Sequence, residues 1–80
     1  MPNVLARVQE VFHSTFDVDP QSITLDTQPG DVDGWDSMGH VTLASGLERE
    51  FKVTFNVDEL MEMENVREIV RIMESKLGVA

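Results

Sequence analysis

The sequence has no cysteine, so a disulfide framework, a thiolate nucleophile and a cysteine-based zinc site are all excluded. Its two histidines are too few for most metal cages. No apolar run approaches the roughly 18 residues that a membrane helix needs. The start, Met1-Pro2-Asn3-Val4, lacks the basic and apolar regions of a signal peptide. We therefore expect a cytoplasmic protein without membrane insertion.

Positive charge is also scarce. Six basic residues stand against fifteen acidic ones, which gives a formal net charge of −9. Such a charge repels phosphate backbones and anionic membrane surfaces, so a nucleic acid is not expected as a partner. The same charge favours association with proteins that present lysine and arginine patches. A plainer explanation, that the charge only keeps a small protein in solution, remains open.

Apolar residues make up 41% of the 80-residue chain and recur at helical spacing in several segments. The length allows one domain, 1–80, without a separate catalytic domain. The pattern predicts helices over 4–16, 37–51, 57–62 and 66–77, with Asn3 capping the first and Gly78 closing the last. In the second helix, the residues expected to face the core are Val41, Leu43, Ala44, Leu47 and Phe51.

The last two predicted helices each start at a pattern typical of a capping box, Asn56 with Glu59 and Asn65 with Glu68. In a capping box, the asparagine and the glutamate side chains each bind the backbone amide of the other residue. The alternating segment 51–55 has no second strand to pair with, so we interpret it as an extended link.

Residues 17–35, between the first two predicted helices, lack helical periodicity and are rich in turn-forming residues. We expect a long loop that is pinned by Val18, Ile23 and Leu25. The predicted fold class is therefore all-α. It is a bundle of three long helices and one short helix, with a long loop between the first and the second.

One serine lies at the junction between this loop and the second helix, in the tract Gly34-Trp35-Asp36-Ser37-Met38-Gly39-His40. A helix N-terminus offers unpaired amides and the positive end of the helix dipole. A phosphate ester on Ser37 would therefore lie in a favourable field. Taken alone, however, the pair Asp36-Ser37 is also what an ordinary helix cap requires.

The whole arrangement resembles the acyl carrier protein family, whose members have a long first loop and an Asp-Ser-Leu motif that opens the second helix. Met38 stands in place of that leucine. The resemblance extends through Leu47-Glu48-Arg49-Glu50-Phe51 to Val66-Arg67-Glu68-Ile69-Val70, and so covers nearly the whole chain. It implies a four-helix bundle of the acyl-carrier type that acts as a monomer.

The resemblance also implies a function. In that family, the serine that matches Ser37 is esterified with 4′-phosphopantetheine from coenzyme A by a phosphopantetheinyl transferase. The thiol of this arm carries an acyl or aminoacyl group as a thioester and delivers it to partner enzymes in fatty acid, other lipid or polyketide biosynthesis. Asp36 matches an aspartate presented to the transferase. Met38 matches an apolar residue that contacts partner enzymes, although core packing would also explain it. The chain is then a carrier and not an enzyme.

Acidic residues are expected to take part in partner recognition. Glu48, Glu59 and Glu62 could form an acidic rim toward enzymes with basic docking patches, while a solvated charged face is the alternative explanation. Gly39 and Thr42 stand where carriers of fatty acid synthases usually have acids. Trp35 and Gly39-His40 resemble more closely the stand-alone carriers of specialised lipid, polyketide or aminoacyl pathways.

Three other functions are alternatives to a carrier. An enzyme would use Ser37 as nucleophile and His40 as base, but 80 residues leave little for a substrate cleft, and a packing role suits His40 better. A calcium loop at Asp31, Asp33 and Asp36 fails because its sixth and twelfth positions lack the required glycine and glutamate. The remaining alternative is an unmodified acidic interaction module with the same fold.

Overall fold

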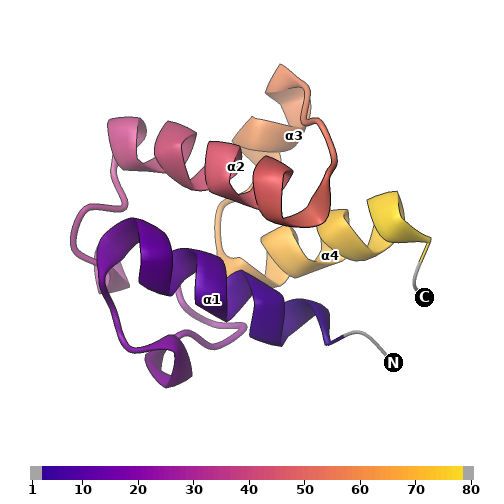
Figure 1. The fold of residues 1–80 in the computed structure, drawn as a ribbon. Coiled ribbons are helices and arrows are strands. Elements are labelled where there is room, and N and C mark those ends of the chain that lie inside the picture. Colours follow the sequence, from indigo (N-terminus) through magenta and orange to yellow (C-terminus); the bar gives the residue numbers. More distant parts are fainter. Residues whose placement is uncertain (1–2, 79–80) are drawn as a thin grey trace.

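The structure, a computed structural model, describes residues 3–78 and is all-helical (Figure 1). The helices are α1 (Val4–Phe16), α2 (Ser37–Phe51), α3 (Val57–Glu62) and α4 (Val66–Leu77). Two 3₁₀ turns, Pro20–Ser22 and Pro29–Asp31, lie in the loop between α1 and α2. There is no β-strand within residues 3–78, and no helix there is long and apolar enough to cross a membrane. The predicted all-α class, with three long helices and one short, is confirmed.

The helices begin where capping residues predict. Asn3 caps α1. At α3 the predicted capping box is complete, because the Asn56 and Glu59 side chains each accept a hydrogen bond from the other residue's amide, at 2.8 and 2.9 Å. These bonds satisfy first-turn amides that a six-residue helix would otherwise leave open.

The predicted capping box at α4 is only half formed. The Asn65 side chain accepts a hydrogen bond from the Glu68 amide at 2.9 Å. The Glu68 carboxylate, however, accepts a hydrogen bond from Arg71 at 2.8 Å instead of returning to the Asn65 amide. Gly78 ends this helix as predicted, in the left-handed conformation with φ of 74°.

One cluster of buried apolar side chains joins the helices to the loop. α1 and α2 lie side by side, and α4 packs against α1 and α3 (Figure 1). Of the positions in α2 predicted to face the core, Val41 is the exception, because 61% of its surface is exposed. The other predicted positions are buried, namely Leu43, Ala44, Leu47 and Phe51.

The long loop is fixed to the bundle over much of its length. Ile23 is buried and Val18 and Leu25 pack partly buried against the core, as predicted. The loop also meets the start of α4 through its backbone, since the Val66 amide donates to the Thr27 carbonyl at 2.9 Å. The loop that leads to Asp36 is therefore a structured segment rather than a free linker.

Candidate functional site

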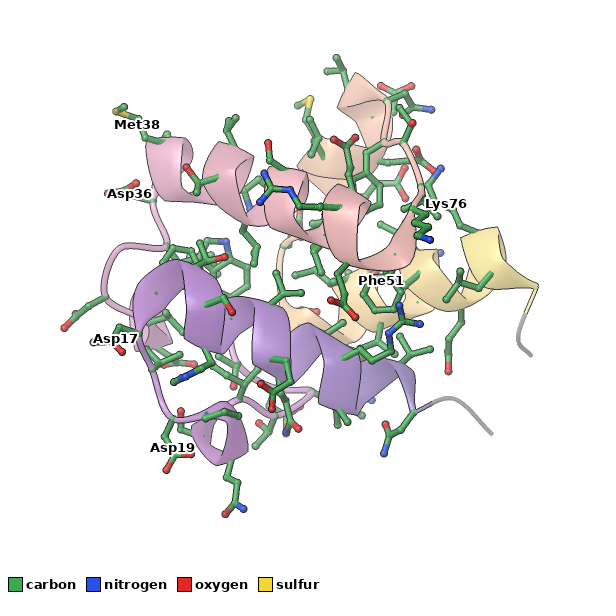
Figure 2. The ribbon with its side chains drawn as sticks, viewed as in Figure 1. Asp17, Asp19, Asp36, Met38, Phe51 and Lys76 are labelled. Atoms are coloured by element: carbon green, nitrogen blue, oxygen red, sulfur yellow. The ribbon has the colours of Figure 1, made fainter. Side chains whose placement is uncertain are left out.

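Ser37 is the first residue of α2, and its side chain is exposed. Asp36 caps the helix, because its Oδ1 atom accepts a hydrogen bond from the Gly39 amide at 2.9 Å. Figure 2 shows Asp36 and Met38 projecting from this end of α2, away from the bundle. Met38 is 82% exposed, so the core-packing alternative for this residue is wrong. The serine hydroxyl thus lies at the positive end of a helix dipole, open to solvent.

A close backbone contact places the start of α2 against the loop. Gly34 has a φ of +92°, which favours glycine, and its carbonyl oxygen lies where a Cβ atom on Gly39 would be. That Cβ atom would also lie 3.1 Å from Cε1 of Phe16. Close packing thus explains why a glycine stands in the first turn of α2, and it sets the position of Ser37.

A histidine bridges three segments next to Ser37. Trp35 Nε1 donates a hydrogen bond to His40 Nδ1 at 2.9 Å, and His40 Nε2 lies 2.9 Å from the Leu60 carbonyl oxygen on α3. Because Nδ1 accepts, the proton of the neutral ring is on Nε2, which donates to Leu60. Both ring nitrogens are therefore occupied, and His40 has no free nitrogen with which to activate the Ser37 hydroxyl.

A surface groove of about 440 Å³ opens beside the serine. Its walls come from the loop, α2, α3 and the segment after α3: Pro29, Trp35, Asp36, Ser37, His40, Val41, Leu60, Met61 and Met63. Val41 and Met61, which are 61% and 73% exposed, make its rim apolar. An extended group attached to the Ser37 oxygen would have room to lie along this groove.

The three glutamates of the predicted acidic rim all have partners within the chain. Glu48 accepts a hydrogen bond from the Phe55 amide at 2.8 Å, and Glu62 binds Arg71 at 3.3 Å. Glu59 binds Lys76 at 2.9 Å. This hydrogen bond from Lys76, followed by the one from the Asn56 amide, lowers the pKa of Glu59 below its ordinary value. A role of these glutamates in partner recognition stays a prediction.

Two of the three aspartates considered for calcium bind backbone amides. Asp31 accepts a hydrogen bond from the Gln28 amide at 3.1 Å, and Asp36 caps α2. In the part of the chain that the structure describes, no three histidine, aspartate or glutamate side chains come together to hold a metal ion.

Comparison with known proteins agrees with this geometry. The sequence profile of the family "phosphopantetheine attachment site" matches residues 6–73. An acyl carrier protein of Petrotoga mobilis is 33% identical over 73 residues, which are 91% of this chain and 86% of that protein. The chain belongs to the acyl carrier protein family. Another acyl carrier protein, from Phenylobacterium zucineum, is 30% identical over 78 residues and covers 98% of this chain and 99% of its own length.

The fold of the acyl carrier family is confirmed by a solved structure. The holo acyl carrier protein of Geobacter metallireducens, determined by solution NMR, matches with a TM-score of 0.85 and 33% identity over 98% of this chain and 88% of that one. A non-reducing polyketide synthase of Emericella nidulans is 33% identical in an alignment over 79 residues that covers 94% of this chain but 3% of that enzyme.

The acyl carrier family has covalently attached 4′-phosphopantetheine as its cofactor, and the match to an attachment-site family confirms that prediction. The residues at the start of α2 fit such a group, because an exposed hydroxyl, helix-terminal amides and an adjacent groove meet there. The bridge from His40 to Leu60 and the groove wall that Leu60 contributes were not predicted from the sequence. Contacts between residues twenty positions apart leave no pattern in a single sequence.

Proposed function

We propose that this chain carries an acyl or aminoacyl group as a thioester on 4′-phosphopantetheine attached to Ser37. It delivers this group to partner enzymes of lipid, polyketide or related biosynthesis. The observation that carries the proposal is the exposed Ser37 hydroxyl at the N-terminus of α2, inside the segment that matches the attachment-site family. The match to part of a polyketide synthase supports the inclusion of polyketide pathways.

The physical setting of Ser37 favours a phosphodiester. The first-turn amides of a helix lack carbonyl partners within the helix, and the helix dipole is positive at this end. Both features stabilise the negative charge of a phosphodiester. The attached arm supplies the thiol that forms the thioester. The residues of this chain place the attachment point and leave it accessible, and they keep α2 in position through the contact between Gly34 and Gly39.

The surroundings of Ser37 suggest how partners would recognise it. Asp36 is exposed and stands next to the serine, where a transferase would meet it. Met38 offers an exposed apolar contact on the other side. Two of the glutamates proposed for docking, Glu59 and Glu62, form ion pairs. The Glu62 side chain is the more exposed of the two, at 56%. We place the protein in the cytoplasm as a monomer, with 1–80 as a single carrier domain.

The experiment that tests this function is the intact mass of the apo protein after incubation with coenzyme A, magnesium and a broad-specificity phosphopantetheinyl transferase. We expect a gain of one phosphopantetheine, which the variant Ser37→Ala loses completely. The matched control is Ser45→Ala, which removes another exposed serine of the same helix and should leave the gain unchanged.

Two results would contradict the proposal. Modification of Ser37→Ala would place the arm on another residue. An unchanged mass with several transferases, in a protein whose circular dichroism shows the folded helical state, would favour an unmodified interaction module instead.

A further inference from the structure

We propose that His40 is a positioning residue that couples α3 to the Trp35 loop only while its imidazole is neutral, and that its protonation opens the groove beside Ser37. The bridge consists of hydrogen bonds among residues of this chain. It therefore exists whether or not Ser37 is modified, and it can be tested on the unmodified protein.

The bridge is set in a rigid place on the loop side. The Trp35 ring is only 3% exposed and packs edge-on against Phe12, with ring centroids 5.0 Å apart. The His40 ring lies beside the indole in nearly the same plane, with ring centroids 6.2 Å apart and ring planes 14° apart. The indole N–H therefore points to Nδ1 of His40 and has little freedom to find another acceptor.

The α3 side depends more strongly on the bridge. α3 has six residues, none of them fully buried, and a helix of that length does not persist without outside contacts. Besides the partly buried packing of Leu60, its recorded links to other elements are two ion pairs with α4 and the hydrogen bond from His40 to the Leu60 carbonyl. Leu60 and Met61 form one wall of the groove, so the position of α3 sets the groove width.

Protonation changes one end of this bridge. A neutral imidazole can accept from Trp35 and donate to Leu60 at the same time, whereas the imidazolium ion has a proton on both nitrogens. The Nδ1–H group and the indole N–H would then face each other as two donors. His40 can keep its bond to Leu60, but it must move away from the indole, and α3 moves with it. The α3 wall of the groove thereby moves away from the Trp35 side.

Other charged groups lie in the groove and on the elements that adjoin this bridge. Asp36 lines the same groove and is already bound to the Gly39 amide. The loop carries Asp17, Asp19, Asp26, Asp31 and Asp33, α3 carries Asp58, Glu59 and Glu62, and α4 carries Arg67, Glu68, Arg71, Glu74 and Lys76. Carboxylates ordinarily titrate near pH 4, whereas histidine is the side chain that ordinarily titrates between about pH 5 and 8. A transition in the histidine range is therefore separable from one in the ordinary carboxylate range.

The chain offers a direct reporter, because Trp35 is its only tryptophan. We would record the indole N–H resonance of Trp35, the ring nitrogens of His40 and the backbone amides of 60–63 by nuclear magnetic resonance, from about pH 8 to about pH 5. In the unmodified protein, the Trp35 and α3 resonances should shift together, with the midpoint of the His40 titration. The His40→Gln variant should lose this shared transition.

Two further variants make the test specific. His13→Gln removes the other histidine, whose Nδ1 contacts the Val18 carbonyl at 2.9 Å, and should leave the response intact. Trp35→Phe keeps an aromatic ring but lacks the opposing donor. His40 should still titrate in this variant while the α3 amides lose most of their shift.

The proposal is overturned if His40 titrates while the Trp35 and α3 resonances stay fixed, or if both still shift in His40→Gln. Should His40→Gln fail to fold, the comparison of the unmodified protein with His13→Gln and Trp35→Phe decides the question. A response that survives unchanged in Trp35→Phe contradicts the opposed-donor explanation.

Discussion

At the scale of single residues, Gly39 is the position at which the start of α2 tolerates least change. A Cβ atom there would overlap the Gly34 carbonyl oxygen, which belongs to the backbone and cannot turn aside. We expect Gly39→Ala to lower the free energy of unfolding by about 1–3 kcal/mol, the usual cost of forcing an atom into a filled space. The measurement is urea denaturation followed by circular dichroism.

Gly30→Ala is the matched control for this substitution. A Cβ atom at Gly30 would meet nothing within 4 Å, and the residue does not have a positive φ. Its effect should stay within about 0.5 kcal/mol, as for most surface substitutions. If both variants lose the same stability, the contact between Gly34 and Gly39 is not what fixes the first turn of α2.

The residue scale also shows what the sequence could predict of the site. Asp36 and Ser37 were found because a helix start follows a turn-rich segment, and that signal is local. Val41 was wrongly placed in the core, since its spacing fits the apolar arc of α2 although 61% of its surface is exposed. The burial of Trp35 was missed because a lone tryptophan in a loop has no periodicity to reveal its orientation.

At the scale of elements, α3 depends on electrostatic contacts, and Glu59 gives the clearest test. The Lys76 hydrogen bond, then that of the Asn56 amide, lowers the pKa of Glu59 in the folded state. A carboxyl group with a lowered folded pKa adds stability above its unfolded pKa and loses it as the pH falls through the folded pKa. The stability advantage of the natural protein over Glu59→Gln should therefore shrink as the pH falls from about 5 to about 3.

Thermal unfolding of both proteins across this pH series measures that advantage. Glu10→Gln removes one acidic charge from α1 and serves as the control for the general effect of net charge. Its difference from the natural protein should not follow the same acid-dependent course. Parallel curves for Glu59→Gln and the natural protein at all pH values would show that the contact between Glu59 and Lys76 contributes nothing.

The element scale was the most predictable from sequence. The bounds of all four helices follow from apolar spacing and from capping residues that act within three or four positions. The half-formed capping box at Glu68 shows the limit, because its carboxylate had a competing partner, Arg71, one turn further along the same helix. The backbone bond between Val66 and Thr27 could not be predicted, since any two residues can make it.

At the scale of the whole molecule, a partner meets a protein with a net charge of −9 and few unpaired basic side chains. Most of the basic residues are paired with acids of the same chain, as in Arg7 with Glu50, Arg67 with Asp26 and Lys76 with Glu59. Next to Ser37, by contrast, the exposed side chains of Met38, Val41 and Met61 are apolar. Charge would thus act on the approach of a partner from a distance, and apolar contact on the docked complex.

These two contributions can be separated by the salt dependence of Ser37 modification. Between about 0.1 M and about 1 M salt, the screening length falls from about 10 Å to about 3 Å. We expect kcat/KM of a phosphopantetheinyl transferase to fall by about tenfold over this range, because steering by charge is lost. Met38→Ala should also lower kcat/KM, and the size of this decrease should be the same at low and at high salt, since the contact that it removes is uncharged.

A comparison of Glu62→Gln with Glu10→Gln then tests which acidic region of the surface attracts the transferase. Both variants reduce the net charge equally, but Glu62 lies on α3, which forms a wall of the groove beside Ser37, and Glu10 lies on α1. If partners approach along α2 and α3, Glu62→Gln should weaken the salt dependence more than Glu10→Gln does. Equal slopes for the two variants would mean that partners respond only to total charge, and a salt-independent rate for the natural protein would leave docking to the apolar surface at Met38 alone.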